Sequence, residues 1–186
     1  IMIGDNATGT IDAADNNTGL GVDVFAALTT GDSNVAVGKD SLTALTTGNY
    51  NVGIGFDALT TNSTGLDNVA IGWNALTTST VSYSTAVGTK ALAANTTGNA
   101  NTAVGRRALE DHTTGDYNVA VGNNALADNT TASSNTAVGV DSLKTNTTGA
   151  NNTAVGYASL DANTTGAANT ALGNAALGAN TTANAN

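Results

Sequence analysis

The residues best suited to acid–base chemistry in this chain of 186 residues lie at Glu110, Asp111 and His112, around its only histidine. A histidine beside carboxylates is a typical general acid or base. However, His112 stands where other copies of a repeat carry a turn asparagine, so we interpret it as an exposed turn residue. The chain has no second histidine to activate its many hydroxyls and a single glutamate, which disfavours nucleophilic catalysis and glycoside hydrolysis. We therefore expect no enzyme, no catalytic residue and no cofactor.

A second candidate chemistry is cation binding by Asp23, Asp40 and Asp57, which recur every seventeen residues. In a stacked repeat their carboxylates would lie on successive layers and repel one another unless a cation such as calcium bridged them. The G-G-x-G-x-D nonapeptide of calcium-loaded β-rolls is missing. A solvated acidic stripe is the favoured interpretation, so we predict no metal and keep these aspartates as a weak candidate.

Large side chains in two otherwise variable positions of the repeat form the candidate binding set. They follow or precede the recurring glycines described below, at positions free to change, so we expect them to be exposed. Exposed aromatics among polar neighbours are typical of glycan and protein receptor sites. The alternative is that the rings cover turns and shield the backbone. The candidate binding residues are Tyr50, Phe56, Trp73, Tyr83, Arg106, Tyr117 and Tyr157.

These residues are positioned by a repeat of seventeen residues that is marked by one glycine per copy, here called the ruler glycine. The copies follow N-[TV]-A-[VI]-G-x-x-[AS]-L-x-x-N-T-T-G-x-x, with a single sixteen-residue step between Gly72 and Gly88. Two earlier glycines, Gly4 and Gly21, belong to degenerate copies, so we divide the chain into degenerate N-terminal rungs (1–33) and regular repeats (34–186). We expect both ends to continue into a longer protein. The regular ruler glycines are Gly38, Gly55, Gly72, Gly88, Gly105, Gly122, Gly139, Gly156 and Gly173.

The pattern within one copy predicts strands and turns. The residues before each ruler glycine alternate between medium and small side chains, as in Val119-Ala120-Val121, which is typical of a strand. The leucine four residues after each glycine is expected to point inward, and N-T-T-G is a turn sequence. Helical spacing of apolar residues is missing. We predict an all-β parallel β-solenoid (β-roll) of about eleven rungs, each with a strand, a turn, a second short strand and a looser turn.

The small amount of apolar material predicts association between chains. Each rung offers about three medium side chains for burial, two from the strand and the leucine, which is too little to offset the cost of ordering the backbone. The other strand face carries only alanine and glycine and permits close approach. Which face meets partner chains stays open at this point.

Composition limits the partners. The net charge of -9 and a pI near 4.1 disfavour nucleic acid and anionic membranes, and no apolar run is long enough to insert into a bilayer. The chain has no cysteine, so it has no disulfide framework, and the redox compartment stays open.

The N-[TS]-A-[VI]-G strand with its N-T-T-G turn, from about residue 17 to 186, resembles the head repeats of trimeric autotransporter adhesins and the repeats of phage and bacterial tail-fibre-domain proteins. The resemblance implies a left-handed homotrimeric β-roll that serves in attachment. It also implies an extracellular location, on a virion tail fibre or a bacterial cell surface.

Three functions follow from these observations. The leading expectation is a non-enzymatic fibre segment, shaft or head, that mediates attachment to a host or cell surface, with itself and a surface glycan or protein as partners. An ice-binding β-solenoid is the first alternative, because stacked threonines can order water. A passive extracellular filament or sheath protein is the second.

Overall fold

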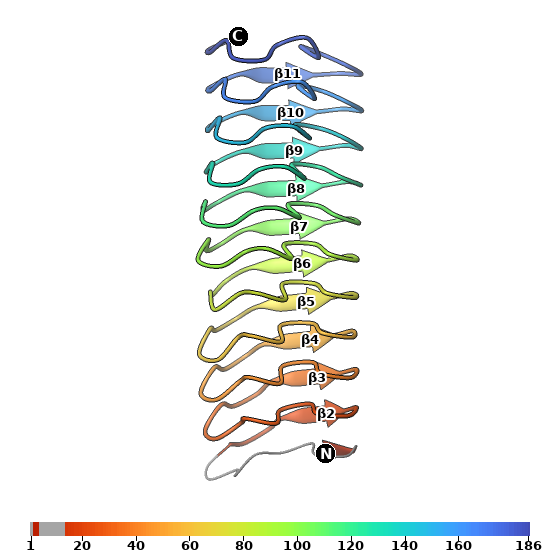
Figure 1. Ribbon diagram of the computed structural model, residues 1–186, viewed down its shortest axis with the longest axis vertical. Coiled ribbons are helices and arrows are strands. Elements are labelled where there is room, and N and C mark those ends of the chain that lie inside the picture. The colour runs from red at the N-terminus through yellow and green to blue at the C-terminus, as the bar shows by residue number, and fades with distance from the viewer. Residues whose placement is uncertain (1, 4–13) are drawn as a thin grey trace.

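The computed structural model describes residues 2–3 and 14–186. Its strands form one parallel sheet of eleven strands in chain order, which stack along a rod (Figure 1). The strands are β1 (Met2–Ile3), β2 (Thr18–Leu20), β3 (Val35–Val37), β4 (Val52–Ile54), β5 (Val69–Ile71), β6 (Thr85–Val87), β7 (Thr102–Val104), β8 (Val119–Val121), β9 (Thr136–Val138), β10 (Thr153–Val155) and β11 (Thr170–Leu172).

Each strand pairs in register with the equivalent strand of the next copy. Val35 pairs with Val52, which pairs with Val69. Seventeen residues therefore return the chain to the same place one strand spacing higher, about 4.8 Å along the rod. The described residues form no helix. A parallel β-solenoid with a seventeen-residue repeat is confirmed, while the number of rungs, the hand of the coil and the trimer stay predictions.

The second short strand predicted for each copy is wrong, because the described residues have one strand per copy. The leucine of the repeat and the residue two before it both have left-handed backbones, with φ 52° at Leu92 and 60° at Lys90. Such alternation turns the chain too tightly for an extended strand. Hydrogen bonding between rungs continues all the same, since the Leu92 N–H donates to the Ala108 carbonyl at 3.0 Å.

The interior of the rod is lined by the smallest strand residue. Ala103 and Ala120 are fully buried, whereas Val104 and Val121 beside them are 37% and 36% exposed. Of the three medium side chains counted for burial in each rung, the two from the strand therefore lie half-exposed on the outer face of a single chain. A Cβ added at Gly53 would lie 2.6 Å from Ser41 Oγ, so even a methyl group is too large there without a shift of the serine. The outer face of the sheet consequently carries valine, isoleucine and threonine.

A column of asparagines, one directly before each strand, is also buried; we call it the inner Asn column. Asn118 Oδ1 accepts hydrogen bonds from the backbone N–H and the side-chain amide of Asn135, at 3.0 and 3.2 Å. Its own amide donates to Asn101 Oδ1 at 3.1 Å and to the Ala132 carbonyl at 2.9 Å. Each buried asparagine thus joins three rungs and closes the turn of its own copy. The column consists of Asn17, Asn34, Asn51, Asn68, Asn101, Asn118, Asn135, Asn152 and Asn169, with Ser84 in one copy.

The ruler glycine is required by close contact between rungs. Gly105 has φ +140°, and a Cβ added there would lie 2.3 Å from the Gly122 carbonyl oxygen. No side chain fits at that distance. The same contact recurs along the rod, which explains the strict recurrence of glycine.

The sixteen-residue step is absorbed in a turn without disturbing the sheet. Val69 of β5 still pairs with Thr85 of β6. The Val81 carbonyl replaces the usual glycine carbonyl and accepts from Asn68 Nδ2 at 2.7 Å. The deletion therefore removes one turn residue and preserves the register of the strands.

The degenerate N-terminal copies join the same stack as far as they are described. β2 pairs with both β1 and β3, and Phe25 is buried where later copies have leucine. The predicted ruler glycine Gly4 lies outside the described residues.

The inner Asn column gives a test of the fold. Asn118→Ala removes the acceptor of the Asn135 N–H and of the Asn135 side-chain amide inside the rod, so we expect it to lower the free energy of unfolding by at least about 2 kcal/mol. Asn123→Ala, at an exposed position of the same copy, should change it by less than about 0.5 kcal/mol. Chemical denaturation followed by circular dichroism measures both. Equal effects would contradict a structural role for the column.

Candidate functional site

His112 lies inside the rod, so the prediction of an exposed turn residue is wrong. It is fully buried in the column that carries turn asparagines such as Asn129 in other copies. Nε2 donates to the Gly115 carbonyl at 2.7 Å, and Nδ1 accepts from Asn129 Nδ2 at 3.2 Å. The ring therefore replaces the amide of an inward-facing asparagine, which sequence reasoning missed because it placed this turn column on the surface.

His112 and its acidic neighbours do not form an acid–base cluster. Glu110 is held by Lys90, whose Nζ lies 3.1 Å from its carboxylate, and by Arg107 Nε. Burial by itself would raise the pKa of Glu110, but the hydrogen bonds from Arg107 and Lys90 outweigh burial and lower it. Both nitrogens of His112 are occupied within the rod. Lys90 and Arg107 thus form local salt bridges with Glu110.

The aspartate column reflects backbone conformation. Asp23, Asp40 and Asp57 have φ values of 56°, 59° and 55°, in the left-handed region that aspartate and asparagine tolerate best among residues with side chains. The Asp40 carboxylate forms an ion pair with Lys39. The portion of the chain that the structure describes holds no group of three His, Cys, Asp or Glu side chains placed to bind a metal ion. The weak candidate metal site is therefore not assembled.

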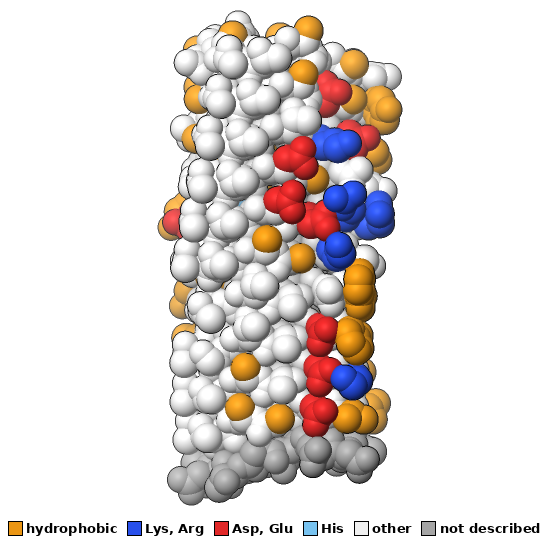
Figure 2. Space-filling model, viewed as in Figure 1, with side chains coloured by type: hydrophobic (Ala, Val, Ile, Leu, Met, Phe, Trp, Pro, Cys, Tyr) orange, Lys and Arg blue, Asp and Glu red, His pale blue; other side chains and the backbone are white. Residues whose placement is uncertain are grey.

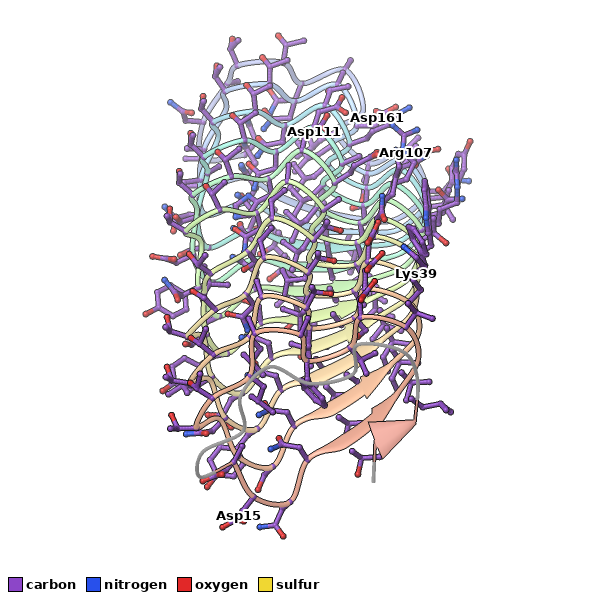
Figure 3. All side chains as sticks on the ribbon, turned by 60° about the horizontal axis from the view of Figure 1, so that its bottom comes forward. Asp15, Lys39, Arg107, Asp111 and Asp161 are labelled. Carbon is purple, nitrogen blue, oxygen red and sulfur yellow. The ribbon has the colours of Figure 1, made fainter. Side chains whose placement is uncertain are left out.

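The residues directly after the ruler glycines, here called the post-glycine column, form one edge of the rod. Phe56 and Trp73 are 43% and 47% exposed and lie on neighbouring rungs. Lys39 Nζ lies 5.3 Å from the centroid of Phe56, and Lys90 Nζ lies 5.8 Å from that of Trp73, both within cation–π range. Hydrophobic, basic and acidic side chains gather along this edge in Figure 2, from which Lys39 and Arg107 project outward in Figure 3.

Arg106 and Tyr157 belong to the same column but lie apart from the two rings. Both are exposed, and Tyr157 is separated from Trp73 by the rungs that carry Thr89, Arg106, Asn123 and Val140. The predicted binding residues after the ruler glycines therefore form one pair of rings and two isolated side chains.

The remaining predicted residues are Tyr50, Tyr83 and Tyr117. They lie just before the strands, whereas the post-glycine column lies just after them, so the two sets are at opposite ends of the strands. They are 61%, 61% and 68% exposed. The exposed position expected for all the candidate aromatics is seen in the structure, and their role in binding stays a prediction.

The described surface contains no pocket, so any ligand would bind along an edge or a face of the rod. Among the described residues, no helix is long and apolar enough to span a bilayer. The outer strand face is the feature that sequence reasoning left unassigned. The signal in the sequence for the direction of this face was the alanine or glycine at the centre of each strand from β2 onward, because the narrow interior of a rung has room only for a small side chain.

No protein-family model, curated protein or solved structure matches the chain. The resemblance to adhesin heads and tail-fibre repeats therefore remains a prediction from the repeat pattern.

Buried His112 gives a prediction for pH dependence. Burial lowers the pKa of His112 below the ordinary value of 6.5, and hydrogen bonds to Gly115 and Asn129 and the charge of Asp116 oppose this only in part. As the pH falls, the histidine of the unfolded chain is therefore protonated at a higher pH than that of the folded chain. The contribution of His112 to stability is present above pH about 6.5 and is lost as the pH falls through that value, by at most about 1.4 kcal/mol of unfolding free energy per pH unit.

His112→Asn restores the asparagine of the other copies and removes this proton-binding group. Between about pH 7.5 and 5.5 we expect the denaturation midpoint of the wild type to fall more than that of the variant. The difference between the two proteins isolates the histidine from the carboxylates. Parallel curves would show that His112 titrates normally in the folded chain.

Proposed function

We propose that this chain is a non-enzymatic structural segment, shaft or head, of a phage tail fibre or bacterial surface adhesin, and that it mediates attachment as a homotrimer. The observation that carries the proposal is the long outer face of the sheet, whose valine, isoleucine and threonine side chains stay partly exposed in a single chain. A thin rod of this kind needs a second source of burial, and copies of itself are the simplest one.

The composition of the outer strand face supports self-association. Ile54 and Ile71 are 36% and 37% exposed, and Leu172 at the last strand is 78% exposed. None of the outward residues of β2 to β11 is charged. An uncharged, half-apolar strip along a rod is typical of an interface between subunits.

The repeat geometry favours a parallel, cyclic arrangement. When chains associate around an axis parallel to the rod, equal rungs lie at equal heights, and every valine or isoleucine column meets its equivalents in the partners. Three chains and a left-handed coil are what the resemblance to adhesin heads implies. The extracellular location has the same basis.

The exposed aromatic side chains support a role in attachment. Trp73 and Tyr83 are 47% and 61% exposed and contribute little to the interior of the rod. Large aromatics on a polar surface are frequent anchors for receptors. The attachment surface would be a glycan or a protein on the host or on a neighbouring cell.

Ice binding remains a second candidate, because the outer strand face is regular and carries Thr136, Thr153 and Thr170 on consecutive strands. Valine replaces threonine in β3, β4, β5 and β8, which breaks the threonine row. The threonines of the turns are less suited to ordering water, since hydroxyls such as Thr113 Oγ1 donate to a carbonyl of the next rung, here that of Thr130 at 2.8 Å.

Self-association is tested by placing charge on the outer strand face. Val104→Asp with Val121→Asp puts two carboxylates at half-exposed positions, where water can solvate them in a single chain but not in an interface. Native mass spectrometry should give three chains for the wild type and one for the double variant. Asn123→Asp with Asn174→Asp adds the same charge outside that face and should stay trimeric. A monomeric wild type would refute the assembly.

Attachment is tested by binding of the purified protein to intact bacterial cells. We expect the wild type to bind and Trp73→Ala or Tyr83→Ala to weaken binding without changing the number of chains per particle. A wild type that binds no surface would leave a passive shaft or filament. Thermal hysteresis in the same preparation, which we expect to be undetectable, would instead indicate the ice-binding alternative.

A further inference from the structure

Tyr50, Tyr83 and Tyr117 occupy one column on alternate rungs, with Asp67 and Ala100 on the rungs between; we call the three side chains the tyrosine comb. The column follows the backbone ladder, since the Tyr83 N–H donates to the Leu66 carbonyl at 3.0 Å and the Tyr117 N–H to that of Asn99 at 3.3 Å. Neighbouring tyrosines are therefore two strand spacings apart, about 9.6 Å.

The fold does not select tyrosine at these positions. The three residues have φ values of 60°, 63° and 60°, where a bulky side chain is disfavoured. Other copies use asparagine, serine or alanine in the same conformation, for example Asn151 and Ser134. Large exposed rings in a disfavoured backbone conformation are better explained by a contact outside the chain than by stability.

The tyrosine comb has no partner among the described residues. None of its side chains makes a hydrogen bond, an ion pair or a ring contact there, and they are 61–68% exposed. Two rings on the opposite edge differ, because Lys39 covers Phe56 and Lys90 covers Trp73, and Tyr157 of that edge is an isolated ring. The comb is thus a row of several rings whose faces are free to stack on one ligand.

A polar column runs directly beside the comb. Asp116 Oδ1 accepts from the Asn99 N–H at 2.7 Å, Asn99 Oδ1 accepts from the Ser82 N–H at 3.2 Å, and Ser82 Oγ accepts from the Leu66 N–H at 3.0 Å. These bonds fix the side chains at regular heights. Asn99 is exposed and Ser82 and Asp116 are half-buried, so polar atoms of this column are within reach of hydroxyl groups of a ligand beside the rings.

The charge around the comb indicates a ligand that is not anionic. Every basic residue of the chain lies one, two or five positions after a ruler glycine, at Lys39, Lys90, Arg106, Arg107 and Lys144. Asp15, a member of the polar column, lies at a different corner of the rod from Lys39 (Figure 3). Asp67 and Asp116 would repel phosphate, sulfate or uronate groups.

We propose that the tyrosine comb binds a neutral, extended β-1,4-linked polysaccharide that lies along the rod. Successive sugars of such a chain are turned by half a revolution, so the same apolar C–H face recurs at every second sugar, at a spacing close to two rungs. Each ring would stack on one of these faces, as aromatic rings pack on apolar surfaces. The polar column would bind the sugar hydroxyls. The inference rests on the proposed attachment function and names its ligand class.

The spacing of the rings, rather than their number, is tested with Tyr83→Asn combined with Ala100→Tyr. This variant keeps three tyrosines in the column, all at left-handed positions, but changes the intervals from two and two rungs to three and one. Retention of the full chain on microcrystalline cellulose and on chitin is compared with retention on cross-linked dextran and on amylose. We expect the wild type to be retained on a β-1,4-linked matrix and not on the other two, and the shifted variant to lose at least tenfold in affinity.

Controls separate this inference from the proposed function. Val140→Asn replaces an exposed apolar residue of the opposite edge, 43% exposed and outside the candidate binding set, and should bind like the wild type. Native mass spectrometry should give the same number of chains for all variants. Equal retention of the shifted variant, or no retention of the wild type on either β-1,4-linked matrix, would overturn the ligand while leaving trimer formation and cell binding intact. Loss of assembly on Tyr83→Asn would instead place the comb in the contact between chains and would also overturn it.

Discussion

The fold depends on hydrogen bonds made by asparagine side chains inside the rod. A seventeen-residue rung with one short strand leaves many backbone groups that no strand pairing satisfies, and water cannot reach those in the interior. The inner Asn column supplies hydrogen-bond partners for these backbone groups. The amide of Asn51 donates to the Gly65 carbonyl at 2.8 Å, and its Oδ1 accepts from the Asn68 N–H at 3.1 Å. A polar ladder of this kind stabilises a rod with little hydrophobic material.

The width of this polar interior decides what lies outside. Once asparagine and leucine side chains occupy the rung, only a methyl group or a hydrogen fits at the centre of each strand, as Gly53 and Ala70 illustrate. The larger strand residues must then face outward. The same constraint that makes one chain stable therefore leaves an apolar strip on its surface, which connects the folding of the single chain to its proposed assembly.

The repeat, the solenoid and the absence of helix could be predicted from the sequence, because a period of seventeen with a strand before each glycine fits few other folds. The direction of the strand side chains could not, since alternation marks two faces and hydrophobicity favours burying valine over alanine. The prediction that His112 is exposed was wrong for a related reason, because a turn sequence usually lies on the surface. Here the turn asparagines point inward and form hydrogen bonds with their own loop, as Asn95 does with Gly98. The candidate aromatics could be found from the sequence because they occupy positions of the repeat that vary from copy to copy, next to positions that hardly vary.

The distribution of side chains over the surface separates structure from recognition. Inward columns vary little, with single exceptions such as Ser84 among the asparagines and Phe25 among the leucines, because every copy must pack against the copies above and below it. Outward columns lack that constraint, and the left-handed corner before the strand accepts residues as different as Ala100 and Tyr117 at nearly the same φ, 55° and 60°. A sequence can therefore change the spacing of exposed rings along the rod in steps of one rung without altering the fold. Such a scaffold sets distances between binding groups in units of the strand spacing, which is why the two-rung interval between the tyrosines carries information about the length of the ligand they would match.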